Sequence, residues 1–153
     1  MLLKWDDQEY YKKATKLKGE IEKGIAQHGL TEHNGKTIYC YEVDGLGKCN
    51  KMDDANVPSL LGLPYIDPKA EVYDHQIYKD TFDFIMSSDN PFYVRGHYKT
   101  EVYGIGSPHT PRGRIWHMAM IMEALLSNDD QRKLQIVRES LENKYRVLHK
   151  GIG

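Results

Sequence analysis

The sequence of 153 residues has few cysteines, no long apolar run and no excess of charge of one sign. Cys40 and Cys49 match no zinc or redox spacing, so we expect two reduced thiols. No apolar stretch approaches the roughly 20 residues that a membrane span needs, which predicts no membrane partner. The formal net charge of −1 gives no electrostatic reason to expect nucleic acid as a partner.

The first residues also lack the apolar segment of a signal peptide, which predicts a cytoplasmic setting unless Met1 is an internal start. The length suits one domain, and the hydrophobic fraction of 40% and charged fraction of 28% are those of a soluble globular protein. The aromatic residues are unevenly distributed, with 11 Tyr against 3 Phe. Rings with a polar edge suit a wet cleft as well as the margin of a core.

Apolar periodicity predicts a mainly α fold with a short β-hairpin and long loops. A helix over residues 7–27 places its apolar residues on one face, and Asn34-Gly35 is a strong signal for a two-residue hairpin turn. We expect further helices over 55–63, with Asp53 or Asp54 as N-cap, and over 71–87. Residues 92–94 and 101–103 are expected to pair as a small ribbon.

Two helices of different character complete the chain. The helix expected over 114–126 is apolar nearly all round and should be buried on most sides, whereas the one over 130–147, capped by Asn128-Asp129, has a single apolar face. This alternation fits concentric inner and outer helical layers, and it also fits an ordinary bundle. The long loops favour the layered arrangement and usually carry function.

Three loop stretches concentrate hydrogen-bonding groups, namely residues 42–47, 52–59 and 104–116. Each has an ordinary structural interpretation. Asp53 and Asp54 can cap the following helix, although both cannot be the N-cap. His109 can be a packed loop histidine, and a single histidine makes no metal site. Trp116 on an apolar helix is more often core than a platform for a sugar ring.

Taken together, carboxylates, an amide, a histidine and aromatic rings at loop–helix junctions suit a sugar ligand, with residues 42–116 lining the cleft. Carboxylates and amides pair with hydroxyls, while the C–H face of a sugar stacks on aromatic rings. Glycoside cleavage requires a pair of carboxyl groups at a defined separation, which sequence spacing does not reveal. The glycines at 104 and 106 do not form a dinucleotide fingerprint.

The loop stretches resemble glycoside hydrolase family 125, the metal-independent exo-α-1,6-mannosidases. The matching segments are 42–47 (EVDGLG), 52–65 (MDDANVPSLLGLPY), 90–93 (NPFY) and 104–110 (GIGSPHT), followed by Ile115-Trp116. The resemblance implies an (α/α)6 barrel, of which residues 1–153 form a part from the C-terminal half. It also implies inverting hydrolysis of terminal α-1,6-linked mannose without metal or cofactor.

The family's general acid lies in an Arg-Pro-Ser-Asp-Asp segment and its general base in a His-Glu-Ser segment, and neither occurs here. The resemblance therefore implies no catalytic residue in this chain and an inactive fragment. It implies substrate binding by Asp53, Asp54, Asn56, His109, Trp116 and Glu42. The chain departs from the family pattern at Phe82, where the family has arginine, and at His117, where it has proline.

A part of a barrel would expose the apolar 114–126 helix, which a soluble monomer rarely tolerates. We therefore expect self-association or pairing with a complementary fragment. The alternative from a different class is a non-catalytic mannoside-binding or oligomerising helical module, and a reading frame without selected function is a third interpretation.

Overall fold

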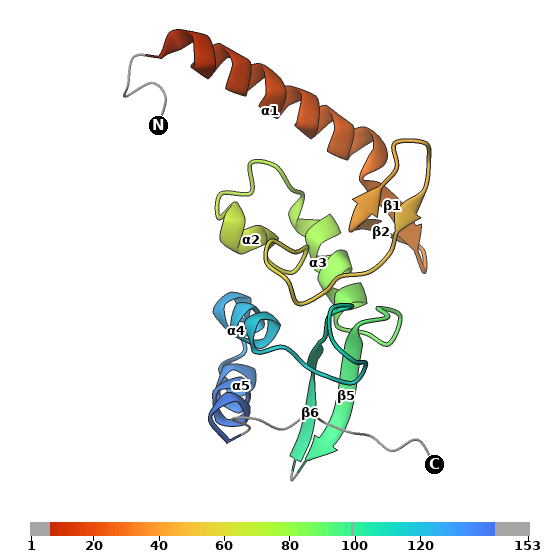
Figure 1. The fold of residues 1–153 in the computed structure, drawn as a ribbon, viewed down its shortest axis with the longest axis vertical. Coiled ribbons are helices and arrows are strands. Elements are labelled where there is room, and N and C mark those ends of the chain that lie inside the picture. The colour runs from red at the N-terminus through yellow and green to blue at the C-terminus, as the bar shows by residue number, and fades with distance from the viewer. Residues whose placement is uncertain (1–6, 99, 143–153) are drawn as a thin grey trace.

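The computed structural model describes residues 7–98 and 100–142, except the side chains of residues 98, 100 and 142. These residues form a helix-rich fold with small antiparallel sheets of two strands each (Figure 1). The elements in chain order are α1 (Gln8–His28), β1 (Leu30–His33), β2 (Lys36–Tyr39), β3 (Glu42–Val43), β4 (Cys49–Asn50), α2 (Leu63–Ile66), α3 (His75–Ile85), β5 (Tyr93–Tyr98), β6 (Thr100–Ile105), α4 (His117–Leu126) and α5 (Asp130–Glu142).

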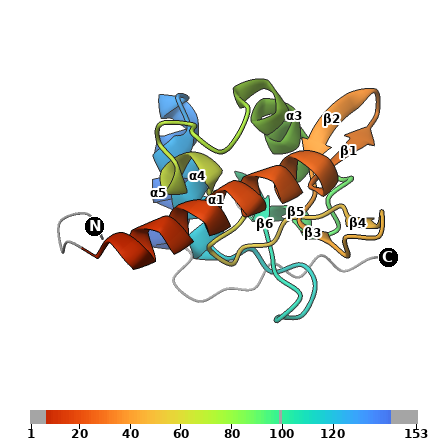
Figure 2. The ribbon, with the colours of Figure 1, turned by 90° about the horizontal axis from the view of Figure 1, so that it is seen from above.

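The predicted first helix is confirmed as α1, with Asp7 as its N-cap accepting a hydrogen bond from the Tyr10 amide at 3.2 Å. α1 lies at one end of the long axis of the molecule, opposite α5 and the β5–β6 hairpin (Figure 1). Seen from that end, it crosses in front of the rest of the chain (Figure 2). None of the α1 residues is buried within the part of the chain that the structure describes. Its apolar row therefore faces solvent.

Both predicted hairpins are confirmed. β1 and β2 pair across Asn34-Gly35, which have φ angles of 50° and 75°, as a two-residue turn between twisted strands requires. β5 and β6 form a longer ribbon than expected, with Tyr93 opposite Ile105 and Arg95 opposite Tyr103. This ribbon leads directly into the loop that precedes α4.

The expected helix over 55–63 is wrong, because helical structure begins only at α2. The reason lies in the two candidate caps. Asp53 accepts hydrogen bonds from the amides of Leu60 and Leu61, seven and eight residues later, and Asp54 accepts one from the amide of Asn56. The Asp54 bond, two residues on, is of the capping type. The Asp53 bonds to residues 60 and 61 instead fold residues 53–61 into a compact loop, so no helix continues from Asp54.

Two other helices begin later than predicted. α3 starts at His75, because Asp74 caps the amides of Gln76 and Ile77. α4 starts at His117, because the Trp116 amide donates to the carbonyl of Ile105 and extends the β6 backbone pairing. The predicted cap at Asp129 is confirmed by its bonds to two amides of α5, and residues 143–147 of the predicted last helix lie outside the described residues.

The core lies between α3, α4 and the two hairpins. Its buried apolar residues come from α3, α4, the β1–β2 and β5–β6 hairpins and the 53–61 loop: Ile38, Ala55, Leu61, Phe84, Ile85, Ile105, Ala119 and Met122. α4 was predicted to be buried on most sides, and within this chain that is wrong. Met118, Ile121 and Leu125 are 48%, 53% and 61% exposed. This agrees with the expectation that a part of a barrel would expose apolar residues of this helix. Among the described residues, no helix combines the length and apolar character needed to cross a membrane.

Candidate functional site

Two of the three predicted loop stretches lie side by side. The Ala55 amide donates to the carbonyl of Gly106 at 2.9 Å, which joins the 52–59 loop to the stretch after β6. The Gly106 amide in turn donates to the carbonyl of Phe92 at 2.8 Å. A β-carbon at position 106 would lie 2.4 Å from the carbonyl oxygen of Arg114, so only glycine allows this close approach. The loops are thus fixed by backbone contacts.

A polar network connects the side chains of these two loops. Asp54 Oδ1 accepts a hydrogen bond from the Asn56 amide at 2.8 Å, and Asp54 Oδ2 accepts one from Asn56 Nδ2 at 2.9 Å. Asn56 Nδ2 also donates to Ser107 Oγ at 3.3 Å. Ser107 was not among the predicted site residues, because nothing in its spacing indicates a partner 51 residues away.

Asp53 lies next to this network but has a different environment. Its side chain is 0% exposed, and each carboxylate oxygen accepts a backbone hydrogen bond, from Leu60 at 3.0 Å and Leu61 at 2.8 Å. Burial raises the pKa of Asp53 to about 7, although the two amide bonds oppose the rise. The contacts of Asp53 hold the loop in shape, and its predicted role in binding substrate stays a prediction.

His109 and Trp116 belong to the same loop. The His109 amide donates to Ser107 Oγ at 3.3 Å, while its side chain is exposed. Trp116 Nε1 donates to Thr110 Oγ1 at 3.0 Å, and its half-buried ring packs against the core. The ring is therefore tethered at its polar edge. Thr110 is a second contributor that sequence patterns did not single out.

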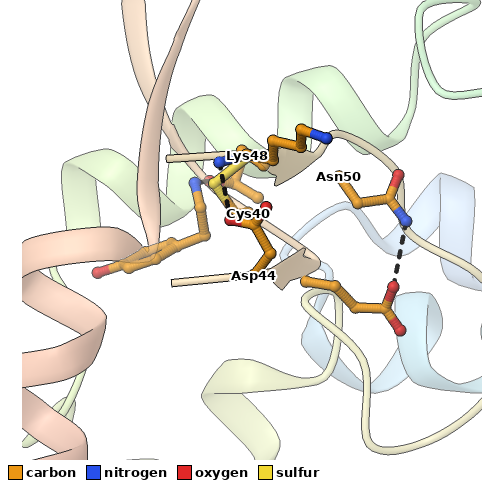
Figure 3. Close-up of a disulfide and its surroundings, with 8 residues drawn as sticks. Cys40, Asp44, Lys48 and Asn50 are labelled. Atoms are coloured by element: carbon orange, nitrogen blue, oxygen red, sulfur yellow. Dashed lines mark hydrogen bonds between the residues drawn. A yellow bond between two sulfur atoms is a disulfide. The ribbon is translucent and has the colours of Figure 1, made fainter. Parts of the chain in front are cut away.

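Glu42 projects from the short hairpin formed by β3 and β4. It is exposed and accepts a hydrogen bond from Asn50 Nδ2 at 3.3 Å (Figure 3). The expectation of two reduced thiols is wrong here, because Cys40 and Cys49 form a disulfide with their Cα atoms 5.5 Å apart. Two cysteines separated by 9 positions reveal no pairing in sequence, whereas the antiparallel β3–β4 turn brings them together.

Tyr41 links the hairpin to the polar network. Its amide donates to the carbonyl of Asn50 at 3.0 Å. Burial, together with the nearby carboxylates of Asp54 and Asp53, raises the pKa of the Tyr41 hydroxyl. Tyr41, which sequence analysis did not select, is thus fixed to Asn50 next to Glu42, and its pKa responds to the carboxylate of the Asp54–Asn56–Ser107 network.

Asn90, between α3 and β5, supports the candidate site through its side-chain amide. Its side chain is buried, and Asn90 Nδ2 donates to the carbonyl of Ile85 at 3.0 Å. Asn90 Oδ1 accepts from the amides of Asp53 and Phe92 at 3.3 and 3.2 Å. One amide side chain thus connects the end of α3, the start of β5 and the 53–61 loop.

The arrangement presents hydrogen-bond acceptors and donors of the kinds that hydroxyl-rich ligands require. Among the described residues, no cluster of three or more His, Cys, Asp or Glu side chains is arranged to hold a metal ion. The six predicted binding residues are brought together in part. Asp54, Asn56, His109 and Trp116 share one connected loop region, Asp53 supports it, and Glu42 lies on the neighbouring hairpin.

Comparison with known proteins gives concordant matches. The sequence matches the metal-independent α-mannosidase family (GH125) over residues 1–152. It is 44% identical over 121 residues to the meiotically up-regulated gene 157 protein of Schizosaccharomyces pombe, a match that covers 77% of this chain and 23% of that protein.

A solved structure from Streptococcus pneumoniae is also similar. It shows a metal-independent α-mannosidase in a non-productive complex with α-1,6-mannobiose, with a TM-score of 0.81 and 37% identity. The match covers 90% of this chain and 31% of that one, so the chain spans less than a third of either relative. The family match over residues 1–152, together with the likeness to the S. pneumoniae structure, shows that this chain belongs to the metal-independent α-mannosidase family, glycoside hydrolase family 125.

Proposed function

We propose that this chain supplies part of the mannoside-binding site of a glycoside hydrolase that removes terminal α-1,6-linked mannose by inverting hydrolysis. The observation that carries the proposal is the Asp54–Asn56–Ser107 network, which joins two family-matching loops. The S. pneumoniae relative that shares this fold was solved with α-1,6-mannobiose. Asp54, Asn56, His109 and Glu42 are the proposed hydroxyl partners. Trp116, whose ring packs against the core, and Asp53 keep their predicted places in the site.

The binding proposal is tested by titrating the chain with α-1,6-mannobiose in a calorimeter. Asn56→Ala should weaken binding by about tenfold, because it removes the amide that joins Asp54 to Ser107 and leaves both without that partner. Asn128→Ala is the matched control, because Asn128 is exposed and lies outside the network. Equal affinities for the two variants, or no binding by the wild type, would contradict the proposal.

Hydrolysis is proposed to require polypeptide beyond this chain. General acid–base chemistry at a glycosidic bond uses two carboxyl groups. The family resemblance assigns these groups to Arg-Pro-Ser-Asp-Asp and His-Glu-Ser segments, and neither segment occurs in this sequence. The purified chain should therefore release no mannose from α-1,6-mannobiose. Mixing it with a polypeptide that carries the Arg-Pro-Ser-Asp-Asp and His-Glu-Ser segments should restore release. Hydrolysis by the chain alone would refute this part of the proposal.

The exposed apolar helix faces favour association with such a polypeptide and the completion of an (α/α)6 barrel. α1 has no buried residue, and α4 exposes Met118, Ile121 and Leu125. α5 exposes Leu134, Val137 and Leu141. Exposed apolar faces of this size are characteristic of interaction sites, and each of the three helices carries one. The proposed occupant is the remainder of the family fold, of which the S. pneumoniae relative contains more than this chain covers.

The same surface favours one second candidate, a non-catalytic mannoside-binding module that self-associates. Gel filtration with light scattering separates the two. A stable oligomer that binds mannobiose, and that gains no activity from the complementary polypeptide, would favour the module. A monomer that forms a complex with the complementary polypeptide would favour the enzyme fragment.

The predicted cytoplasmic setting remains a proposal, which localisation of the tagged protein tests. The Cys40–Cys49 disulfide argues against it, because the cytosol keeps thiols reduced.

A further inference from the structure

The hairpin formed by β3 and β4 has little to hold it in place. Its ladder consists of two residue pairs, Glu42 with Asn50 and Val43 with Cys49, and most of residues 41–50 are exposed. A two-stranded hairpin of this size is at best marginally stable in water. The β1–β2 hairpin differs, because it has four pairs and its last residues, Ile38 and Tyr39, enter the core.

The tip of this hairpin is satisfied by its own contacts. Asp44 Oδ1 accepts a hydrogen bond from the amide of Lys48 at 3.0 Å (Figure 3) and another from the amide of Leu46 at 2.8 Å. The Asp44 amide donates to the carbonyl of Lys48 at 3.3 Å. These bonds shape the turn but connect it to nothing outside residues 44–48. The direction of the hairpin must therefore be set at its base.

The Cys40–Cys49 disulfide lies at that base. Cys40 is buried, and its amide donates to the carbonyl of Gly29 at 2.8 Å, which fixes the incoming strand to the end of α1. The outgoing strand carries Cys49 and Asn50 and continues into the buried residues 52–55 of the polar network. The disulfide thus joins the two strands at the point where the hairpin leaves the core.

The residues next to the disulfide are those that meet the candidate site. Tyr41 follows Cys40 directly, and its amide donates to the carbonyl of Asn50 at 3.0 Å. Glu42 follows Tyr41 and accepts its hydrogen bond from Asn50. A small rotation of the hairpin about its base would move Tyr41 and Glu42 together.

We propose that the Cys40–Cys49 disulfide positions the sugar-binding site, by holding the Tyr41 backbone against Asn50 and the Glu42 carboxylate beside the Asn50 side chain. Asn50 then acts through Glu42 and is itself a positioning residue. The inference rests on the proposed mannoside binding and adds to it a requirement for the crosslink. It also assigns the disulfide a local role, as distinct from general stabilisation of the chain.

Hydrogen exchange on the full chain tests the local role. In Cys49→Ser, which breaks the bond at its more exposed end, exchange of the Tyr41 amide should accelerate by about a hundredfold, the size expected for losing a crosslink over a separation of 9 residues. Residues 30–39 of the β1–β2 hairpin provide the internal control and should keep their protection. Loss of protection in both hairpins, in Cys49→Ser and in reduced wild type alike, would overturn the inference.

A double-mutant cycle tests the link to binding. In the disulfide-bonded protein, Asn50→Ala should weaken α-1,6-mannobiose binding by about fivefold, because it removes the side-chain donor that holds the Glu42 carboxylate. In the Cys49→Ser background the same substitution should have no further effect. An equal loss in both backgrounds would overturn this inference alone. Absence of binding by the disulfide-bonded wild type would instead overturn the proposed function.

Discussion

Replacing Arg132 with methionine should destabilise the chain by about 3–5 kcal/mol, because it leaves a buried carboxylate without its partner. The Arg132 and Glu123 side chains are each 6% exposed. Arg132 Nε and Nη2 donate to the two oxygens of Glu123 at 2.7 and 2.9 Å, and Nη2 also donates to the carbonyl of Tyr103 at 3.0 Å. The guanidinium carbon lies 3.7 Å from the centroid of the Tyr103 ring.

These contacts join α4, α5 and β6, so one substitution removes two charge-assisted bonds, a bond to backbone and a cation–π contact. Arg132 Nη1 also lies 4.0 Å from the buried Glu139 carboxylate, so the double variant Arg132→Met/Glu123→Leu should recover only part of the loss. Lys133→Met is the matched control. Lys133 pairs with Asp130 at the surface, and its loss should cost less than about 1 kcal/mol.

Urea unfolding measures the difference. Trp116 fluorescence reports on the core if Trp5 is replaced by phenylalanine, because the chain has two tryptophans. An unchanged slope of the free energy against urea would show that the variants unfold to a similar extent. A loss below about 1 kcal/mol for Arg132→Met, or a double variant less stable than the single one, would refute the reasoning.

Three further predictions concern the loops. Asp53→Asn should lower the free energy of unfolding in urea by about 1–3 kcal/mol. The Leu60 and Leu61 amides each donate to one Asp53 oxygen, and in the variant one of them would face the NH₂ group, which is also a donor. An unchanged urea midpoint would contradict this prediction. The raised pKa of Asp53, about 7 against an ordinary 3.8, means that the folded state keeps a proton that the unfolded state releases. The free energy of unfolding should therefore fall as pH rises from about 4 to about 7 and level off above that. Asp53→Asn should remove this pH dependence. If the variant shows the same pH dependence as the wild type, the effect belongs to another group. Gly106→Ala should destabilise by about 1–3 kcal/mol, because its β-carbon would meet the Arg114 carbonyl, whereas Gly19→Ala on open helix surface should stabilise α1 by about 0.5–1 kcal/mol; similar thermal shifts for both would refute the steric argument.

Locally encoded elements were predicted well from sequence. The extent of α1 follows from its apolar period and the Asp7 cap, and the β1–β2 turn follows from the positive φ that Asn34-Gly35 tolerates. The prediction of a helix over 55–63 failed because the sequence does not reveal which backbone amides will donate to a given carboxylate. Asp53 bonds to amides seven and eight residues away, a choice made by the packing of the loop on Asn90.

The candidate site shows the same division. Residue types in 52–59 and 104–116 indicated a polar loop region, and the structure brings Asn56 and Ser107 together. Ser107, Asn90 and Tyr41 act through contacts across 37 or more residues or between neighbouring loops, for which a single sequence offers no signal. The Cys40–Cys49 pair was missed for a related reason, since only the β3–β4 register makes the two positions adjacent.

The lack of tertiary support along α1 has a consequence for cooperativity. A helix that buries none of its side chains gains little from the folding of the core, so α1 should melt as a separate cooperative unit of low stability. On heating, far-ultraviolet ellipticity should begin to fall before Trp116 fluorescence changes. The two transitions would then report on different ligands. A saccharide bound at the loops would raise the second, whereas a polypeptide seated on α1 would raise the first.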